Sequence, residues 1–416
     1  MFQRTGPAAY KNSLDNILKL DDFYGNPHRS FRTIHVAGTN GKGSVSHMLA
    51  AVLQMAGYRT GLYTSPHLKD FRERIRINGQ MIGRNDVTAW VEGYKNSAIS
   101  KEIDPSFFEL TVAMAFDFFS ANKVDVAVVE VGLGGRLDST NIITPEVSII
   151  TNIGLDHTAL LGDSLKKIAI EKAGIMKPKI PVVIGANQPG IKKVFEDRSK
   201  LVKAPLFFAE RDYIVSYLLS DLYDNQIFNV INNGEEIYAD LKVDLGGRYQ
   251  QKNLPAVLQT LDIVQSVGWN ITKENILSSL SQVKILTGIR GRWQILGKNP
   301  LIVADAAHNA DGIAEVVKQI RQIPYKNLHI IFGMVNDKDP LPIMKLLPGD
   351  AQYYFTKAAI PRALDERELA SYAAMAGLKG NTYTSVNNAY STARDRAGKN
   401  DFIFVGGSTF VVAEVL

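Results

Sequence analysis

The chain has 416 residues, too many for one typical hydrophobic core, and hydrophobic residues make up 45% of it, enough for two domains. The absence of cysteine excludes disulfides, thiolate zinc sites and a cysteine nucleophile. The net charge of +5 is spread without a dense basic tract, so small anionic substrates are expected rather than nucleic acid. No apolar run approaches the roughly 20 residues that span a bilayer, and no signal peptide opens the chain, which predicts a cytoplasmic protein without membrane binding.

The first part of the chain alternates short apolar runs with helical patterns. Strands are predicted at 33–37, 60–63, 124–129, 147–151 and 181–184, with helices at 44–56, 107–120 and 164–173. Apolar strands that alternate with helices are typical of a mostly parallel sheet covered on both faces.

The pattern changes between 213 and 243 to alternating, β-rich segments interrupted by Asn232-Asn233-Gly234, which predicts an added antiparallel patch or hairpin. Two helices are expected next, at 250–267 and 272–282. A glycine- and arginine-rich stretch, 288–292, resembles a hinge. Strands are then predicted at 301–304, 328–332, 352–356 and 402–405, separated by helical patterns. The expected domains are therefore 1–288 and a smaller α/β domain at 289–416.

The most specific local pattern is Gly38-Thr39-Asn40-Gly41-Lys42-Gly43-Ser44, which we call the phosphate loop, between a predicted strand and a helix. It is two residues shorter before the lysine than the common G-x-x-x-x-G-K-[ST] form. Glycines let backbone N–H groups turn toward phosphate oxygens, the helix N-terminus adds positive charge, and Lys42 neutralises the β- and γ-phosphates. Ser44 can then reach a phosphate-bound Mg²⁺. The alternative is a glycine turn that only joins a strand to a helix.

A nucleotide site also needs an acidic strand end to hold magnesium, and the apolar run at 126–129 ends in Glu130. The glycine-rich segment 132–135 that follows allows a ligand or backbone to approach closely. The alternative for Glu130 is a solvent-facing glutamate. His157 follows the strand at 147–151, where ligand sites of α/β proteins gather, but spacing alone does not separate it from a structural histidine.

Five ordered segments together resemble the folylpolyglutamate synthase and dihydrofolate synthase family, within the Mur-type amino-acid ligases. They are His35-Val36-Ala37 with the phosphate loop, Tyr63-Thr64-Ser65-Pro66-His67-Leu68, Glu130-Val131-Gly132-Leu133-Gly134-Gly135-Arg136-Leu137-Asp138, Glu171-Lys172-Ala173-Gly174-Ile175 and Asp305-Ala306-Ala307-His308-Asn309. The resemblance covers essentially the whole chain and implies a phosphate-loop domain with a smaller, Rossmann-like C-terminal domain. Ala306 and Ala310 depart from the glycine and proline that the family often has, and no pterin contacts are transferred to residues before Phe31.

The resemblance also implies roles by position. Ser65, Glu130 and His157 would be magnesium ligands, with Ser44 near the phosphate-bound ion and two Mg²⁺ ions in all. Lys172 matches the lysine that the family carbamylates with CO₂; the alternative is an ordinary solvated lysine. Further implied positions are the ATP contacts Asn253, Arg292 and Asp305, the catalytic candidates Lys42, Lys172 and His308 near the phosphates, and the pterin-site residues Phe107, Phe108, Glu109, Leu137 and Asp138. Adjacent phenylalanines are more often part of a core.

The implied activity is ATP-dependent ligation of glutamate to dihydropteroate, to the terminal glutamate of a reduced folate, or to both, through an acyl phosphate. The expected partners are these small molecules, and the protein is expected to be a monomer. One alternative is a Mur-type ligase of cell-wall precursors, which would need a further N-terminal domain where only about 37 residues precede the phosphate loop. Another is a phosphate-loop nucleotide switch or motor, whose phosphate release would not depend on glutamate.

Overall fold

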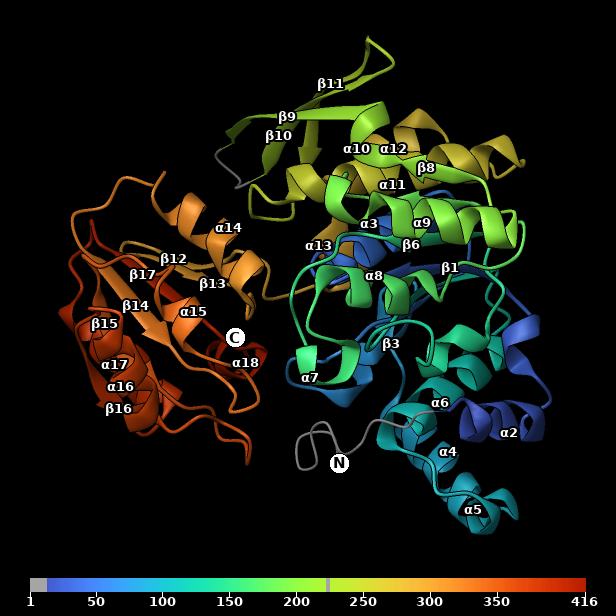
Figure 1. The fold of residues 1–416 in the computed structure, drawn as a ribbon, viewed down its shortest axis with the longest axis horizontal. Helices are drawn as coiled ribbons and strands as arrows, with labels where there is room; N and C mark the ends of the chain where they lie inside the picture. Colours follow the sequence, from blue (N-terminus) through green and yellow to red (C-terminus); the bar gives the residue numbers. More distant parts are fainter. Residues whose placement is uncertain (1–12, 222–224) are drawn as a thin grey trace. The chain divides into compact units, whose positions relative to one another are not determined.

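The computed structural model describes residues 13–221 and 225–416, which form two compact units with separate sheets and cores (Figure 1). Within the described residues, the first unit comprises 13–245 and 249–289, and the second comprises 246–248 and 290–416. The segment 246–248 belongs to the second unit because it packs there: a Cβ on Gly246 would lie 2.5 Å from the carbonyl oxygen of Trp293. No pattern in the sequence predicts that the chain enters the second unit at 246–248 and returns to the first unit at 249.

The first unit is built on an eight-stranded sheet with the order β4-β3-β2-β5-β1-β6-β7-β8. The strands from β2 to β8 in that order are parallel, whereas β3 and β4 extend the edge in antiparallel fashion. The bounds are β1 (Arg32–Ala37), β2 (Thr60–Tyr63), β3 (Ile75–Ile77), β4 (Gln80–Met81), β5 (Val126–Glu130), β6 (Val147–Ile150), β7 (Val182–Ile184) and β8 (Leu206–Phe208). The predicted mostly parallel sheet is confirmed. The edge strands β4 and β8, and β3 next to β4, have two or three residues each, too few to show a period in the sequence.

Both faces of this sheet are buried, as strand β5 illustrates. Val126 and Val128 enter a core with α3 (Lys42–Met55), α11 (Gln250–Ser266) and α12 (Lys273–Leu280), while Ala127 and Val129 enter a second core with α6 (Phe107–Ala121). Successive side chains of a strand point to opposite faces, so these two cores lie on opposite sides of the sheet.

The remaining elements of the unit are α2 (Asp15–Phe23), η2 (Pro27–Arg29), η3 (Phe71–Arg74), α4 (Arg84–Asn96), α5 (Ile99–Glu102), η4 (Ser139–Ile142), α7 (Thr158–Leu161), α8 (Leu165–Ala173), α9 (Pro189–Val202), α10 (Ala209–Asp212) and α13 (Val283–Thr287).

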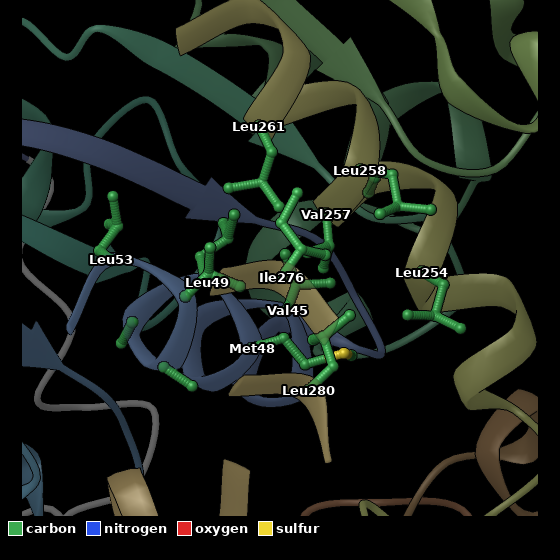
Figure 2. Close-up of a cluster of buried hydrophobic side chains, with 14 of the residues drawn as sticks. Val45, Met48, Leu49, Leu53, Leu254, Val257, Leu258, Leu261, Ile276 and Leu280 are labelled. Carbon is green, nitrogen blue, oxygen red and sulfur yellow. The ribbon is translucent and has the colours of Figure 1, made fainter. Parts of the chain in front are cut away.

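Helices α3 and α11 pack against each other through leucine-rich faces, with α12 beside them (Figure 2). The labelled side chains are Val45, Met48, Leu49 and Leu53 of α3, Leu254, Val257, Leu258 and Leu261 of α11, and Ile276 and Leu280 of α12. Their spacing of three or four residues places them on one face of each helix. This packing holds the helix that begins at Lys42 against the helix that begins at Gln250.

Leu261→Ala should lower the free energy of unfolding of the first unit by about 2–5 kcal/mol, because it removes a fully buried side chain and leaves a cavity. Leu201→Ala makes the same chemical change at a leucine that is 73% exposed, and should cost less than about 0.5 kcal/mol. Urea denaturation of both variants measures the difference. Equal midpoints for the two variants would contradict the packing of α11 on α3.

The predicted antiparallel patch is confirmed as a three-stranded sheet with the order β11-β10-β9. Its strands are β9 (Tyr213–Ser220), β10 (Gln226–Asn232) and β11 (Glu235–Val243), and the Asn233-Gly234 turn joins the last two. These strands pair with one another and not with the eight-stranded sheet. Tyr213, Phe228 and Leu241 instead add their side chains to the core around α11.

The second unit is a smaller α/β domain, as predicted, with a six-stranded sheet in the order β12-β13-β17-β14-β15-β16. All neighbouring strands are parallel except β12 with β13. Helix α14 buries Ile313, Val316, Val317 and Ile320 against the sheet, a spacing typical of an amphipathic helix. The bounds are β12 (Gln294–Lys298), β13 (Leu301–Ala304), α14 (Ala310–Ile320), β14 (Leu328–Phe332), α15 (Leu341–Met344), β15 (Gln352–Thr356), α16 (Glu366–Met375), β16 (Gly380–Tyr383), α17 (Val386–Arg396), β17 (Phe402–Gly406) and α18 (Thr409–Val415).

Two strands of this unit, β12 and β16, were not predicted. Both lie at the edges of the sheet, and β16 is mostly exposed, so neither has a buried apolar run. Of the helices in the described residues, none combines the length and the apolar character that crossing a membrane requires.

Candidate active site

The carboxyl ends of four neighbouring strands of the first unit lie at one edge of the sheet, in the order β2, β5, β1 and β6. Register pairs Val36 of β1 with Glu130 of β5, and Ala37 of β1 with Ile150 of β6. The chain therefore leaves these strands side by side. Ser65 follows β2, the segment 132–135 follows β5, the phosphate loop follows β1, and His157 lies in the loop after β6. Ligands of open α/β sheets bind at such an edge.

Two glycines of the phosphate loop stand where no side chain would fit. A Cβ on Gly38 would lie 1.8 Å from Oγ1 of Thr151, and a Cβ on Gly41 would lie 2.2 Å from Oδ1 of Asn253. Gly41 also has φ +85°, which L-residues with a side chain rarely adopt. The phosphate loop is thus enclosed between the loop after β6 and the start of α11.

The loop after β6 holds the phosphate loop by hydrogen bonds. The Thr39 N–H donates to the Asn152 carbonyl at 2.9 Å, and the Thr39 hydroxyl accepts from the Gly154 N–H at 2.9 Å. The Asn40 N–H donates to Oδ1 of Asn152 at 2.8 Å. Sequence reasoning singled out this segment only for His157. Its threonine, asparagine and glycine, residue types that hydrogen-bond nearby backbone, were the available signal for this supporting role.

Gly41→Ala should weaken ATP binding by about 10-fold or more, because the new methyl group must displace Asn253 in addition to straining the backbone. Gly57→Ala is the matched control, since Gly57 has φ +91° but nothing within 4 Å of its Cβ position. It should cost about 1–2 kcal/mol of stability through backbone strain and leave ATP affinity unchanged. Calorimetric titration with ATP compares the two variants, and equal affinities would contradict the enclosed geometry.

Lys42 and Lys172 meet at one carbonyl. Nζ of Lys42 donates to the carbonyl oxygens of Gly38 at 3.1 Å and Thr39 at 3.3 Å, and Nζ of Lys172, from α8, donates to the same Gly38 oxygen at 2.8 Å. Burial, and after it the charge of Lys42, lower the pKa of the Lys172 ammonium to about 7, against the opposing effect of Asp156 and Asp138. Lys172 is 4% exposed, so the solvated alternative weighed from the sequence is excluded.

Glu130, at the end of β5 next to β1, is 4% exposed, and Ser44, the last residue of the phosphate loop, is 1% exposed. Within the described residues there is no group of three or more His, Asp or Glu side chains that could hold a metal ion by themselves. Mg²⁺ usually takes one or two carboxylates and fills its other positions with water and substrate phosphate. One buried carboxylate at the end of β5, the strand next to the one that leads into the phosphate loop, fits that requirement.

His157 stands at the start of the short helix α7, with φ +49° and a half-exposed ring. Its backbone N–H donates to Oδ1 of Asp156 at 2.9 Å, and its ring Nε2 lies 3.9 Å from the same oxygen. A left-handed backbone conformation on a residue other than glycine is uncommon and gathers at functional sites. This conformation does not by itself separate a functional from a structural role, because eight other described residues that are not glycine share a positive φ, among them Lys123 and Lys203.

The segment after β5 packs against the end of α8. A Cβ on Gly135 would lie 2.9 Å from the Glu171 carbonyl oxygen, and a Cβ on Gly174 would lie 2.3 Å from the Cβ of Arg136. The Arg136 N–H donates to the Glu171 carbonyl, and the two side chains form an ion pair at 3.0 Å. These glycines therefore allow two backbones to approach, and this approach places Lys172 beside the phosphate loop.

Two acidic residues assigned to the pterin site have hydrogen bonds that shape their own loops. Oε2 of Glu109 accepts from the Ser106 N–H at 2.6 Å in a capping box at the start of α6. Asp138 accepts from the Leu133 N–H at 2.8 Å and from the Thr140 hydroxyl at 2.5 Å. Burial raises the pKa of the Asp138 carboxyl, and these hydrogen bonds oppose the rise. Asp138 also accepts from the Thr140 N–H at 3.0 Å and from the Gly132 backbone, so hydrogen bonds of its own loop occupy the roughly four acceptor positions of this carboxylate.

Phe107 and Phe108 are half-buried and surround polar side chains that sequence reasoning missed. Phe108 packs on Gly132, where an added Cβ would lie 2.4 Å from the Phe108 ring, and the Phe108 ring centroid is 6.2 Å from that of Tyr63.

The Arg74 guanidinium lies 5.5 Å from the Phe107 ring centre, and its Nε donates to Nδ1 of His67 at 2.8 Å. Burial lowers the pKa of His67 to about 4, so the ring is neutral. Leu137 is half-buried in the neighbouring loop. The sequence signal for this cluster, an arginine close to a phenylalanine at the end of a strand, was present and was not used.

In the second unit, Arg292, Asp305 and His308 lie on adjoining segments. Asp305 is buried and accepts from the Trp293 N–H at 2.7 Å and the Ala307 N–H at 2.8 Å. Nη1 of Arg292 donates to the Gly291 carbonyl at 3.2 Å, and that carbonyl also accepts from the Ala306 N–H. Nδ1 of His308 lies 2.9 Å from the Ala306 carbonyl oxygen. These residues form one local cluster at the end of β13.

Two protein families match the chain. The Mur ligase middle domain matches residues 36–261, and the Mur ligase glutamate ligase domain matches residues 291–409. A Bacillus subtilis dihydrofolate synthase/folylpolyglutamate synthase is 31% identical over 97% of this chain and 94% of its own length. A probable bifunctional folylpolyglutamate synthase/dihydropteroate synthase of Haloferax volcanii is 33% identical over 97% of this chain, which spans only 48% of that relative.

Solved structures extend the similarity to three dimensions. E. coli FolC in complex with DHPP and ADP has a TM-score of 0.88 at 26% identity, over 100% of this chain and 94% of that one. A bifunctional folylpolyglutamate synthase/dihydrofolate synthase with Mn, AMPPNP and L-glutamate bound has a TM-score of 0.84 at 27% identity, over 98% and 94%. The match to the middle domain covers more than half of the chain, and the Bacillus subtilis relative matches over nearly its whole length. The chain therefore belongs to the folylpolyglutamate synthase/dihydrofolate synthase family of the Mur ligases.

Proposed function

We propose that this chain is a bifunctional ligase that adds L-glutamate both to dihydropteroate and to the terminal glutamate of reduced folates. The family membership makes it an ATP-dependent ligase, and the Bacillus subtilis relative carries both activities in its name. The meeting of Lys42 and Lys172 at the Gly38 carbonyl is the observation that supports ligase chemistry, and the double name of the Bacillus subtilis relative supports the choice of both acids. A second buried lysine from a distant helix is not required by a loop that only binds nucleotide.

The reaction needs an activated carboxylate, because a free carboxylate is a poor electrophile toward an amine. The substrate carboxylate attacks the γ-phosphorus of ATP, which forms an acyl phosphate and releases ADP. The glutamate amine then attacks the acyl carbon and releases phosphate. Lys42 and the backbone N–H groups of the phosphate loop stabilise the charge on the transferred phosphoryl group, so positioning and electrostatics supply most of the catalysis.

Lys172 serves this chemistry as a carbamate. Its pKa of about 7 leaves a large share of the amine neutral near neutral pH, and the neutral amine is the form that reacts with CO₂. The nitrogen–carbon bond forms as one C–O π bond of CO₂ breaks, the nitrogen loses one proton to water, and the product is an anion within reach of Lys42. It replaces the repulsion between two lysines with an attraction, which favours the modified state at this buried position.

Glu130, Ser65 and His157, with Ser44, are the residues that would hold magnesium. The bound ion supplies charge neutralisation at the phosphates. Manganese in the related structure with AMPPNP supports a divalent metal in the family. Asn253, Arg292 and Asp305 would contact ATP, with His308 near the phosphates, and the half-buried rings of Phe107 and Phe108 would line the pterin site.

The domain assignment follows the matched families. Residues 1–288 would bind ATP and the pterin acid, and residues 289–416 would take glutamate, as the name of the C-terminal family indicates. The substrates are small molecules, and we propose a monomer, which light scattering after size-exclusion chromatography checks.

The test is ADP release by purified protein with ATP and Mg²⁺, in the presence and absence of glutamate, dihydropteroate and tetrahydrofolate. ADP should form only when glutamate and one pterin acid are present together, and mass spectrometry should find the amide product with each acid. Activity with one acid alone would restrict the proposal to a single synthase. ATP turnover without glutamate, and no amide, would instead favour a nucleotide switch.

A further inference from the structure

Gln250, the first residue of α11, is fully buried and joins two residues of the candidate nucleotide site. Its Nε2 donates to Oγ of Ser44 at 3.3 Å, and its Oε1 accepts from Nδ2 of Asn253 at 2.7 Å. Asn253 in turn stands where a Cβ of Gly41 would be. The side chains of one helical turn therefore span the phosphate loop from Gly41 to Ser44.

These hydrogen bonds fix the direction of the Ser44 hydroxyl. A serine oxygen has two lone pairs and one proton, and the amide N–H of Gln250 takes one lone pair. The second lone pair and the proton must then point away from α11. Without this donor the hydroxyl of a buried serine could rotate toward α11, and the lone pair needed by a cation would lose its orientation.

The orientation of the Gln250 amide is itself set by its neighbour. Asn253 lies three residues further along α11, on the same face of the helix, and presents its N–H to Oε1 of Gln250. The amide nitrogen of Gln250 is thereby left facing Ser44. A buried amide pays a desolvation cost unless both of its ends are hydrogen-bonded, and here both partners belong to the nucleotide site.

We propose that Gln250 is a positioning residue for the divalent cation of the nucleotide, acting through the Ser44 hydroxyl. This inference rests on the proposed function, in which Ser44 lies near the phosphate-bound Mg²⁺. Groups that orient a metal ligand typically change metal affinity or activity 10–100-fold when they are lost. The sequence analysis did not single out Gln250, because a glutamine in the first turn of a helix has no distinctive pattern.

The experiment measures the dissociation constant of Mn²⁺ from the protein with AMPPNP by electron paramagnetic resonance, which needs no turnover, and beside it kcat and the KM for Mg²⁺ at saturating ATP. The dissociation constant for Mn²⁺ should change in parallel with the KM for Mg²⁺ in every variant. Gln250→Met keeps the length of the side chain but removes both hydrogen bonds, and should raise the KM for Mg²⁺ about 10-fold with a smaller change in kcat. Gln250→Asn, whose shorter amide cannot reach Ser44 while remaining polar, should also raise it. Gln259→Met is the matched control, because Gln259 is a buried glutamine of the same helix with no hydrogen bond to its Oε1. Its KM for Mg²⁺ should not change.

A KM for Mg²⁺ within twofold of the wild type in both Gln250 variants would overturn the inference. Ser44→Ala separates this outcome from a failure of the proposed function. If Ser44→Ala raises the KM for Mg²⁺ and the Gln250 variants do not, only the role of Gln250 is wrong. If Ser44→Ala has no effect, the assignment of Ser44 is wrong and the inference falls with it. In the double variant Ser44→Ala/Gln250→Met, the KM should equal that of Ser44→Ala alone, because Gln250 acts through Ser44.

Discussion

Lys42→Met should lower kcat/KM for ATP about 10³-fold, because it removes the cation that meets the charge on the transferred phosphoryl group. The free energy of unfolding should change by less than about 1 kcal/mol. The Lys42 ammonium is only partly buried, and its hydrogen bonds are those to the Gly38 and Thr39 carbonyls. Steady-state kinetics and urea denaturation measure the two quantities on the same preparation.

Lys167→Met is the control for this change. Lys167 is a lysine of the same unit whose side chain is 62% exposed and pairs with Asp163 on the surface. Its loss should leave kcat/KM within twofold of the wild type, because exposed pairs contribute little to stability and lie outside the proposed chemistry. If Lys42→Met retained a tenth of the wild-type activity, the phosphate loop would not be the catalytic site.

Lys172→Arg should lower kcat about 100-fold, because arginine stays protonated and cannot be carbamylated. Lys177→Arg is the matched control. Burial also lowers the pKa of Lys177, but its Nζ donates to the Asn141 carbonyl and not to the phosphate loop. Mass spectrometry of intact native protein should find one carboxylate adduct on the wild type and none on Lys172→Arg. Full activity of Lys172→Arg, with no adduct on the wild type, would reject the carbamate.

The pKa of Lys172 also predicts the pH dependence. Wild-type protein stripped of CO₂ should have low activity at every pH, because no carbamate can form. Added bicarbonate should restore activity above about pH 7, where the Lys172 amine is neutral, and not below it, where the amine is protonated. The free energy of unfolding should depend on pH in the same direction as the activity. Between about pH 7 and 10.5 the unfolded chain holds a proton that the folded chain lacks, so the free energy of unfolding should rise with pH across this range. Lys172→Met should reduce that rise, with a part remaining from Lys177, whose pKa is also lowered, and denaturation at a series of pH values measures the difference.

Local patterns were sufficient wherever a buried run carried its own signal. The strands at 301–304, 328–332 and 352–356 were predicted with the bounds that the structure has, because a strand buried on both faces is mostly apolar, and only Gln352 of these three strands is exposed. The phosphate loop was recognisable for a similar reason: its glycines, lysine and serine are consecutive, and each is required by the local geometry. Edge strands such as β16 have no continuous apolar run, because an exposed edge accepts polar residues, and the sequence therefore did not predict them.

The pterin-site residues show how far composition and resemblance reach. Phe108 was assigned from its place in a family motif, but that it packs on Gly132 follows only from the approach of α6 to the loop after β5. Glu109 received the same assignment, yet its carboxylate caps its own helix at Ser106. A glutamate three residues after a serine is the pattern of a capping box, so this use was present in the sequence and was not read.

The sequence by itself determined the mostly parallel α/β fold, the smaller second domain, the phosphate loop and the family, because each of these depends on residues that are neighbours in the chain. Only the tertiary structure decided which distant groups face that loop. Lys172 meets the Gly38 carbonyl across 134 positions of sequence, and Gln250 meets Ser44 across 206. The first contact requires the 132–135 segment to pack closely on α8, and the second requires α3 to pack closely on α11. Both arrangements result from the packing of many side chains together. No spacing along the chain encodes them, so the environment that lowers the pKa of Lys172 appears only once the chain is folded.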